Sequence, residues 1–256
     1  MLGRNNIREK MKNKEPLISC MLRFPVPATM EILALAGVDL VIIDNEHYPF
    51  NPQTLIDLVR AADVHGMATC VRVPNCEPTR IAQIMDMGVD GIMVPSVDSY
   101  EEAMQLVNAV KYPPLGTRGF CPITRAASYG MKMKPDEFAA FSNEKSFVIV
   151  QIETKSGVAD LEKILSIPDV DVIEYGPSDL AASYGMPGHN DDPQIQTIVN
   201  EIISKALSAG KDVPYMVHSP EAAIEALEKG FTHISLGSDQ QMITAGIRAL
   251  VGEVKK

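Results

Sequence analysis

Short apolar runs recur along the whole chain, and each is four to six residues long and rich in β-branched side chains. Runs of this kind predict buried strands, because a strand in a parallel sheet is covered on both faces. Eight strands are expected, at Leu17–Leu22, Leu40–Ile43, Thr69–Val73, Gly91–Val94, Phe147–Ile152, Val170–Tyr175, Val213–Val217 and Thr232–Leu236.

Segments with apolar residues at helical spacing lie between these runs. They predict helices at Met30–Ala36, Pro52–His65, Pro78–Met87, Ser99–Val110, Gly157–Ser166, Pro193–Ala209 and Pro220–Lys229. Three junctions share one pattern, in which a glycine ends a helix and an apolar residue follows it: Gly37-Val38, Gly88-Val89 and Gly230-Phe231. Eight alternating strand–helix units favour a closed parallel (β/α)8 barrel, the TIM barrel, over an open doubly wound sheet.

One connection breaks this alternation. The segment Lys111–Ser146 is too long for a single connection and carries Gly116, Arg118 and Gly119. Long loops in compact domains are more often functional than decorative. A functional loop is therefore expected here, at the edge of the barrel that carries the chemistry.

Length and composition agree with one barrel. A chain of 256 residues, 46% of them hydrophobic, can bury one large core, and about 250 residues is the usual size of such a barrel. A single domain over residues 1–256 is expected.

Net charge and the lack of targeting signals indicate which cell compartment and which classes of binding partner to expect. A net charge of −10 argues against nucleic acid and against an anionic membrane surface. The segment Met1–Pro16 has five basic residues and no apolar signal region, and nowhere do 18 apolar residues run together. The cysteines lack zinc-type or CxxC spacing, so reduced thiols and a cytoplasmic location are expected.

Two acidic residues stand just past neighbouring strands. Glu153 follows Val148-Ile149-Val150-Gln151-Ile152, and Asp179 comes 26 positions later, after Tyr175-Gly176-Pro177-Ser178. That separation is one βα unit, so both carboxylates are expected side by side at the carboxyl edge of the barrel. Two hard oxygen ligands at this edge predict a Mg²⁺ or Mn²⁺ site.

Further polar residues follow the second strand and interrupt the third. Strand alternation puts Asp44 and Glu46 on one side, and His47 leads the next loop as a candidate general base. Arg72 interrupts an apolar strand, where an unpaired charge would cost several kcal/mol. Two interpretations of Arg72 stay open: a structural ion pair with Asp44 or Glu46, or a fixed guanidinium that meets a substrate carboxylate or a developing enolate. Gln151 faces the same side as Glu153.

Together these segments resemble the HpcH/HpaI aldolase family, the metal-dependent pyruvate aldolases. The resemblance runs from about Phe24 to about Val251 and rests on ordered motifs: Asp44-x-Glu46-His47, Arg72, Gly116-x-Arg118-Gly119, Gln151-x-Glu153 and Gly176-Pro177-Ser178-Asp179-Leu180. It implies a (β/α)8 barrel, commonly a hexamer built from dimers that exchange their last helix. It also implies reversible cleavage of a 4-hydroxy-2-oxo acid to pyruvate and an aldehyde.

The resemblance assigns roles to individual residues. It places metal ligands at Glu153 and Asp179, the base at His47 and the enolate-stabilising arginine at Arg72. It places substrate contacts at Gln151 and Ser178. It places the acid that raises the basicity of the histidine at Asp86, whereas the local pattern favours Asp44 for that role.

Departures from the family pattern concern the substrate. The family often has glycine at Asn45 and an aliphatic pair at Glu174-Tyr175, and Tyr48-Pro49-Phe50 is bulkier than usual. The identity of the aldehyde is therefore not carried over.

Two alternatives to this function stay open. One is a decarboxylase or other lyase that acts on a 2-oxo diacid such as oxaloacetate, and the other is a non-catalytic barrel that binds a small acid. The main chemical rival, a Schiff-base aldolase using Lys155, is disfavoured because no apolar neighbours in the sequence would lower the pKa of that lysine. The expected cofactor is Mg²⁺ or Mn²⁺, with Co²⁺ also usable.

Overall fold

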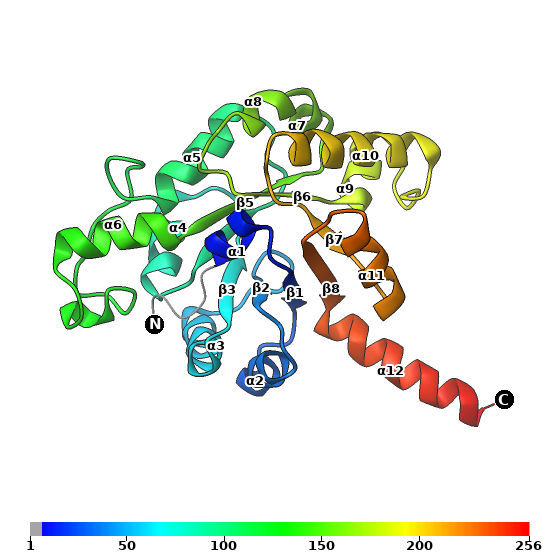
Figure 1. The fold of residues 1–256 in the computed structure, drawn as a ribbon, viewed down its shortest axis with the longest axis horizontal. Coiled ribbons are helices and arrows are strands. Elements are labelled where there is room, and N and C mark those ends of the chain that lie inside the picture. Colours follow the sequence, from blue (N-terminus) through cyan, green and yellow to red (C-terminus); the bar gives the residue numbers. More distant parts are fainter. Residues whose placement is uncertain (1–6, 256) are drawn as a thin grey trace.

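The structure, a computed structural model, describes residues 7–255. Residues 1–6 and residue 256, which the predicted domain includes, lie outside the described part. Eight parallel strands form one sheet in the order β6-β5-β4-β3-β2-β1-β8-β7. Figure 1 shows the strands in the middle of the molecule with helices around them. The strands are β1 (Leu17–Leu22), β2 (Leu40–Asp44), β3 (Ala68–Arg72), β4 (Gly91–Val94), β5 (Phe147–Ile152), β6 (Val172–Tyr175), β7 (Pro214–Met216) and β8 (His233–Ser238).

The two ends of this sheet meet, so it curls into a nearly closed barrel. Val172 of β6 forms a parallel bridge with Asp212 just before β7, and the N–H of Ile173 donates to the Asp212 carbonyl at 2.9 Å. The predicted (β/α)8 barrel with eight parallel strands is thus confirmed, and each predicted strand matches an observed one to within two residues at either end.

The helices follow most of the predicted segments. Those that match are α2 (Pro27–Leu35), α3 (Pro52–His65), α4 (Pro78–Asp86), α5 (Tyr100–Val110), α10 (Pro193–Ser208) and α11 (Pro220–Glu228). The predicted helix at 157–166 is two short helices, α7 (Lys155–Ala159) and α8 (Leu161–Leu165). Further helices are α1 (Ile7–Asn13), η1 (Ser128–Gly130), α6 (Pro135–Lys145), α9 (Pro177–Ser183) and α12 (Asp239–Val254).

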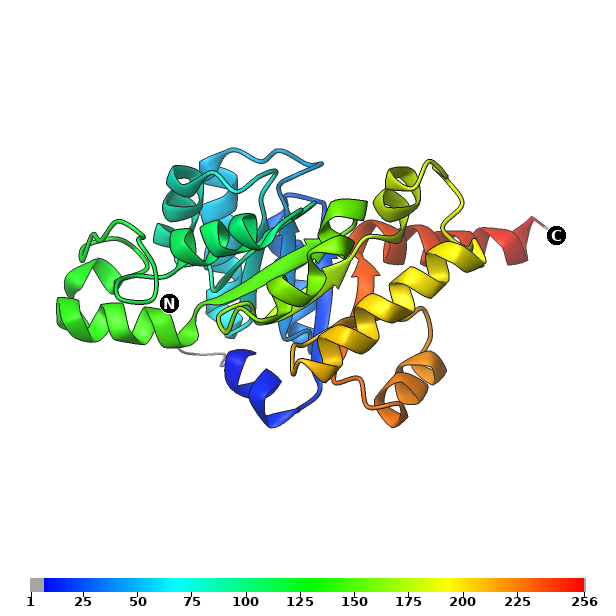
Figure 2. The ribbon, with the colours of Figure 1, turned by 90° about the horizontal axis from the view of Figure 1, so that it is seen from above.

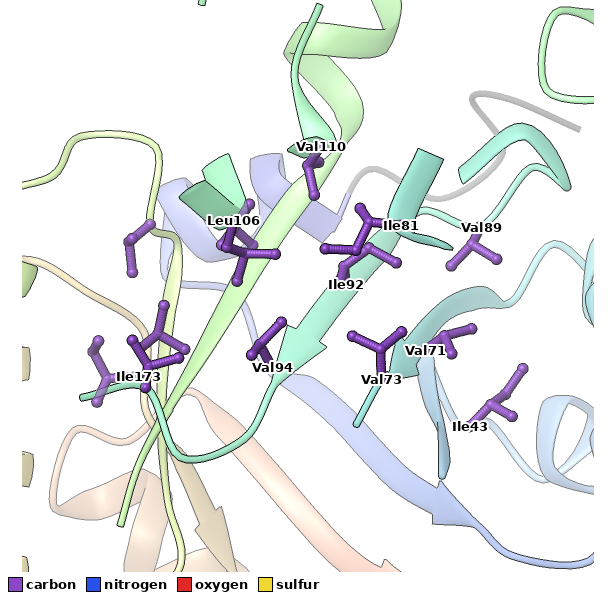
Figure 3. Close-up of a cluster of buried hydrophobic side chains, with 14 of the residues drawn as sticks. Ile43, Val71, Val73, Ile81, Val89, Ile92, Val94, Leu106, Val110 and Ile173 are labelled. Atoms are coloured by element: carbon purple, nitrogen blue, oxygen red, sulfur yellow. The ribbon is translucent and has the colours of Figure 1, made fainter. Parts of the chain in front are cut away.

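Two apolar layers hold the barrel together. The outer layer lies between strands and helices, and Figure 3 shows Val71, Ile92 and Val94 from the strands against Ile81 and Leu106 from α4 and α5. The inner layer fills the barrel, and Ile7 and Met11 of α1 close its amino end. Both layers leave the carboxyl ends of the strands free for polar side chains.

The long connection Lys111–Ser146 lies at the amino end of the barrel, because it leads from the end of α5 to the start of β5. The prediction that this segment forms a functional loop at the carboxyl edge of the barrel is therefore wrong about its position. The connection contains α6, and its buried Arg118 pairs with Asp86 of α4 and stacks over the Tyr112 ring at 4.4 Å. In residues 7–255, no helix is long and apolar enough to cross a membrane.

Candidate functional site

The carboxyl edge of the barrel gathers the predicted polar residues from four strands. Asp44 ends β2 and Arg72 ends β3, while Glu153 follows β5 and Asp179 lies in the first turn of α9, just after β6. Gln151 of β5 is in register with Glu174 of β6. The site therefore depends on the barrel, which brings together ends of strands that are far apart in the sequence.

Glu153 is almost completely buried and is held by three hydrogen bonds. Its Oε1 accepts from the N–H and the hydroxyl of Ser96, both at 2.9 Å, and its Oε2 accepts from the Gln151 amide. Burial raises the pKa of Glu153 to about 7, against the Ser96 hydrogen bonds, and the Asp179 carboxylate also raises it. The main charges that act on this carboxyl group among the described residues are the negative ones of Asp179 and Glu46.

Ser96 is a residue of the site that sequence patterns did not indicate. Its φ of +50° lies in the left-handed region. This conformation is unfavourable for residues other than glycine and persists where the surrounding structure enforces it. Here the conformation lets both its N–H and its hydroxyl reach Glu153. A serine in a loop after β4 gives no signal of this role in the sequence.

Gly176 makes room for the same carboxylate. A Cβ at this position would overlap Oε2 of Glu153 and come within 2.9 Å of Nε2 of Gln151. The glycine before Pro177 is therefore required by the close approach of β6 to Glu153, and α9 begins directly after it.

Asp179 and Ser178 lie at the exposed start of α9. Asp179 is solvent-exposed, and its charge acts on the buried Glu153. The Ser178 hydroxyl accepts from the Asn190 amide at 3.0 Å. The start of α9 thus presents a free carboxylate beside a hydroxyl that is held in place.

These groups fit a hard divalent cation. The Asp179 charge raises the pKa of the buried Glu153, and Oε1 of the buried Gln151 has no hydrogen-bond partner among the described residues. Among residues 7–255 no group of three or more His, Cys, Asp or Glu side chains is arranged for a metal. Glu153 and Asp179 could hold such a cation, with water and substrate oxygens in the other positions, as is usual for Mg²⁺.

Arg72 is fixed by two carboxylates. Its Nε and Nη2 donate to the two oxygens of Asp44 at 3.2 and 2.7 Å, and its Nη1 lies 3.0 Å from Oε2 of Glu46. The ion pair considered from the sequence is therefore present. The ion pair does not use every hydrogen-bond donor of the guanidinium, because each terminal nitrogen carries a second N–H.

His47 lies on a loop that Asp44 and Asn45 organise. Asp44 accepts from the backbone N–H groups of Glu46 and His47, both at 3.3 Å, and the Asn45 side chain accepts from the N–H of Phe50 at 2.7 Å. The imidazole itself is 61% exposed, and its Nε2 is 3.8 Å from Oε2 of Glu46. Asp44 thus positions the His47 backbone, and Glu46 is the acid within 4 Å of its ring.

Asp86 and Lys155 lie apart from this group. Asp86 is the last residue of α4, at the amino end of the barrel, so within one chain it is separated from His47 by the length of the barrel. The Lys155 side chain is exposed, with its ammonium 4.7 Å from the centre of the Tyr184 ring. This exposure differs from the apolar, desolvated pocket that a Schiff-base lysine needs.

Comparison with known proteins gives consistent matches over nearly the whole chain. A family model described as HpcH/HpaI aldolase/citrate lyase matches residues 21–245. A 5-keto-4-deoxy-D-glucarate aldolase from Salmonella arizonae is 35% identical over 98% of this chain and 97% of its own.

Solved structures agree. An HpcH/HpaI aldolase/citrate lyase family protein from Burkholderia cenocepacia has a TM-score of 0.90 at 29% identity, covering 98% of this chain and 100% of its own. An HpcH/HpaI aldolase from Desulfitobacterium hafniense has a TM-score of 0.89 at 26% identity, covering 98% and 96%.

The pKa of Glu153 makes cation binding depend on pH. A cation at Glu153 must displace the proton that this group holds below about pH 7. The apparent Mn²⁺ affinity is expected to rise, by up to about tenfold per pH unit, from pH 5 to 7 and then to level off. Electron paramagnetic resonance of free Mn²⁺ measures it. Glu162→Gln, at an exposed position, is the control and should behave as wild type. Affinity that does not depend on pH, or tight Mn²⁺ binding by Glu153→Gln, would show that Glu153 is not a cation ligand.

Proposed function

The chain belongs to the HpcH/HpaI aldolase/citrate lyase family, and we propose that it is a divalent-metal-dependent aldolase. It reversibly cleaves a 4-hydroxy-2-oxo acid to pyruvate and an aldehyde. The observation that carries this proposal is the buried Glu153 beside Asp179, with a fixed guanidinium and an exposed imidazole at the same barrel mouth.

Glu153 and Asp179 hold the cation, which is Mg²⁺ or Mn²⁺, with Co²⁺ as a further candidate. When bound, the cation supplies a positive charge that stabilises negative oxygen on the 2-oxo acid. Nε2 of Gln151 donates one N–H to Glu153 and carries a second one, and the Ser178 hydroxyl, which accepts from Asn190, keeps its own O–H. Both side chains can therefore donate to oxygens of the pyruvate half.

Arg72 stabilises the charge that develops on pyruvate. Its guanidinium does not need to reorganise during the reaction, because Asp44 and Glu46 already hold its plane. Fixed donors directed at a developing oxyanion are worth about 3 to 4 kcal/mol in comparable sites. The ion pair and the catalytic role thus support each other.

His47 takes the proton from the 4-hydroxyl as the C3–C4 bond breaks. In the reverse direction it returns that proton to the oxygen of the aldehyde. The exposure of its imidazole suits a group that exchanges protons with substrate and solvent.

A second copy of the chain completes the protein. Residues 243–252 of α12 are exposed. The exposed apolar residues of this helix recur at helical spacing: Ile243, Ile247, Leu250, Val251 and Val254. Figures 1 and 2 both show α12 projecting away from the barrel. An isolated apolar stripe of this kind needs a partner surface.

The barrel offers such a surface. A last helix of a (β/α)8 barrel packs between the first and the seventh of its ring, here α2 and α11. Both are apolar on the outside, with Ile32 66% and Leu35 75% exposed on α2 and Ile224 58% exposed on α11. Exchange of α12 between two copies would cover these residues, and a hexamer of such dimers is the assembly that the family resemblance implies.

The role that the family resemblance gives Asp86 is possible between two subunits of this assembly but not within one chain. If it raises the basicity of a His47 ring, that ring belongs to a neighbouring subunit, because the two residues lie at opposite ends of one barrel. The cytoplasmic location stays a prediction from the sequence.

The proposed function is tested with pyruvate, a panel of aldehydes, and Mg²⁺, Mn²⁺ or Co²⁺. Formation of 4-hydroxy-2-oxo acids, followed by mass spectrometry, is the expected result. Release of CO₂ from oxaloacetate with no aldol product would favour the decarboxylase. Binding of pyruvate with neither reaction would favour the small-acid-binding barrel.

His47→Ala should separate two partial reactions. Aldol cleavage is expected to slow by about 10² to 10⁴, whereas exchange of pyruvate methyl protons, which involves no 4-hydroxyl, should slow much less. Coupled assays of cleavage and proton NMR of exchange measure the two rates. His65→Ala, an exposed histidine on α3, serves as the control. Equal losses in both reactions would give His47 a role in holding the site instead.

Ile247→Glu with Leu250→Glu should prevent assembly. Two charges on the apolar stripe of α12 are expected to yield a species near the 27.9 kDa chain mass, whereas the wild type elutes as a multiple of it. Light scattering after size exclusion measures both. Arg248→Glu, on another face of the same helix, should assemble normally. A monomeric wild type would refute the exchange.

A further inference from the structure

Glu174 is an acid of the barrel wall that the proposed reaction leaves without a role. It is the third residue of β6 and is in register with Gln151 of β5. Side chains alternate along a strand. Val172 of β6 and Ile149 of β5 lie in the inner apolar layer, whereas Ile173 lies in the outer layer, as Figure 3 shows. Glu174 and Gln151 therefore both point into the barrel.

The carboxyl group of Glu174 is half-buried and has one weak contact. Its Oε1 accepts from the N–H of Tyr175 at 3.4 Å, which is long for a hydrogen bond. Residues 7–255 make no other hydrogen bond or ion pair with it. Burial raises the pKa of Glu174 to about 7, although His233, the Tyr175 N–H and Arg72 act in the other direction. Near neutral pH such a group can both give and take a proton.

The other acids around the pyruvate half are already engaged. Asp44 and Glu46 pair with Arg72. Under the proposed function, Glu153 and Asp179 hold the cation. None of these four carboxylates is therefore available to transfer a proton to carbon.

His233 also points into the barrel, at the start of β8, but it is completely buried. Its Nδ1 lies 2.6 Å from Oδ2 of Asp212, and its Nε2 lies 2.9 Å from the Ser19 hydroxyl. Both ring nitrogens thus have partners. Glu174, with its open oxygens, is the better placed of the two to meet a substrate.

The proposed cleavage needs two proton transfers. His47 takes one proton from the 4-hydroxyl, and a second proton must reach C3 of the enolate to form the methyl group of pyruvate. His47 follows β2, and Glu174 lies on β6, four strands away in a ring of eight. The two side chains therefore approach the substrate from opposite walls. The aldehyde that leaves beside His47 does not block Glu174 from C3.

We infer that Glu174 is a further catalytic residue, which gives the proton to C3 of the pyruvate enolate and removes it in the reverse direction. This inference rests on the proposed function and adds its second proton transfer. In cleavage, the O–H bond of the Glu174 carboxyl group breaks and the electron pair of the enolate forms the new C3–H bond. Glu174 is left as a carboxylate. Solvent water then reprotonates it, and the proton held by His47 passes to solvent.

The test compares two steps in Glu174→Gln, which keeps the size and polarity of the side chain but cannot transfer the proton. Exchange of pyruvate methyl protons in D₂O with Mg²⁺ requires removal of a proton from C3. Release of aldehyde in the first turnover of aldol cleavage precedes protonation of C3. Exchange should slow by about 10² to 10⁴, the usual contribution of a general acid or base, and first-turnover release much less. Proton NMR and rapid quenching measure the two rates.

Further variants separate proton transfer from a structural effect. Glu174→Asp keeps a carboxyl group and should retain part of the exchange, while Glu162→Gln, at an exposed glutamate, should exchange as wild type. The Mn²⁺ affinity of Glu174→Gln should match that of the wild type.

Three results would overturn the inference: undiminished exchange in Glu174→Gln, equal losses of exchange and first-turnover release, or a wild type that forms aldol product without exchanging methyl protons. A wild type that neither exchanges methyl protons nor forms aldol product with any aldehyde would instead overturn the proposed function itself.

Discussion

The site depends on one buried carboxylate. Glu153 is taken out of water, beside a second acid at Asp179, and its pKa rises to about 7 as a result. A buried charge without a partner is unfavourable by several kcal/mol. Three features nevertheless hold the group in one orientation: both donors of Ser96, the Gln151 amide and the bare backbone of Gly176. The arrangement is explained if a divalent cation supplies the missing charge.

Arg72, on the other side of the barrel mouth, is a buried positive charge. Arg72 also lies in a buried strand, but its charge is balanced by Asp44 and Glu46 within the chain. The same Asp44 accepts from the backbone N–H of His47, so one carboxylate positions both the Arg72 guanidinium and the loop that carries the imidazole. In the proposed function, the cation held by Glu153 and Asp179 binds the 2-oxo acid, and Arg72 stabilises the negative charge that forms on it.

Much of this could be predicted from the sequence, because strands and their ends leave local signals. All eight strands were identifiable from their apolar runs, and the positions of Glu153 and Asp179 follow from one βα repeat. Ser96 could not be identified, since its role comes from a backbone conformation and a contact with a residue 57 positions away. The long connection was placed at the wrong edge, because its length shows nothing about which end of the barrel it spans.

The most direct test of the account is the exchange of pyruvate methyl protons for deuterium, followed by proton NMR in D₂O with Mg²⁺. Exchange requires stabilisation of the enolate but no aldehyde, so it isolates the role proposed for Glu153 and Asp179. The account predicts exchange that stops with EDTA, recovers with Mg²⁺, and is lost in Glu153→Gln but not in Glu162→Gln. Undiminished exchange after EDTA, or trapping of pyruvate on Lys155 by borohydride, would contradict it.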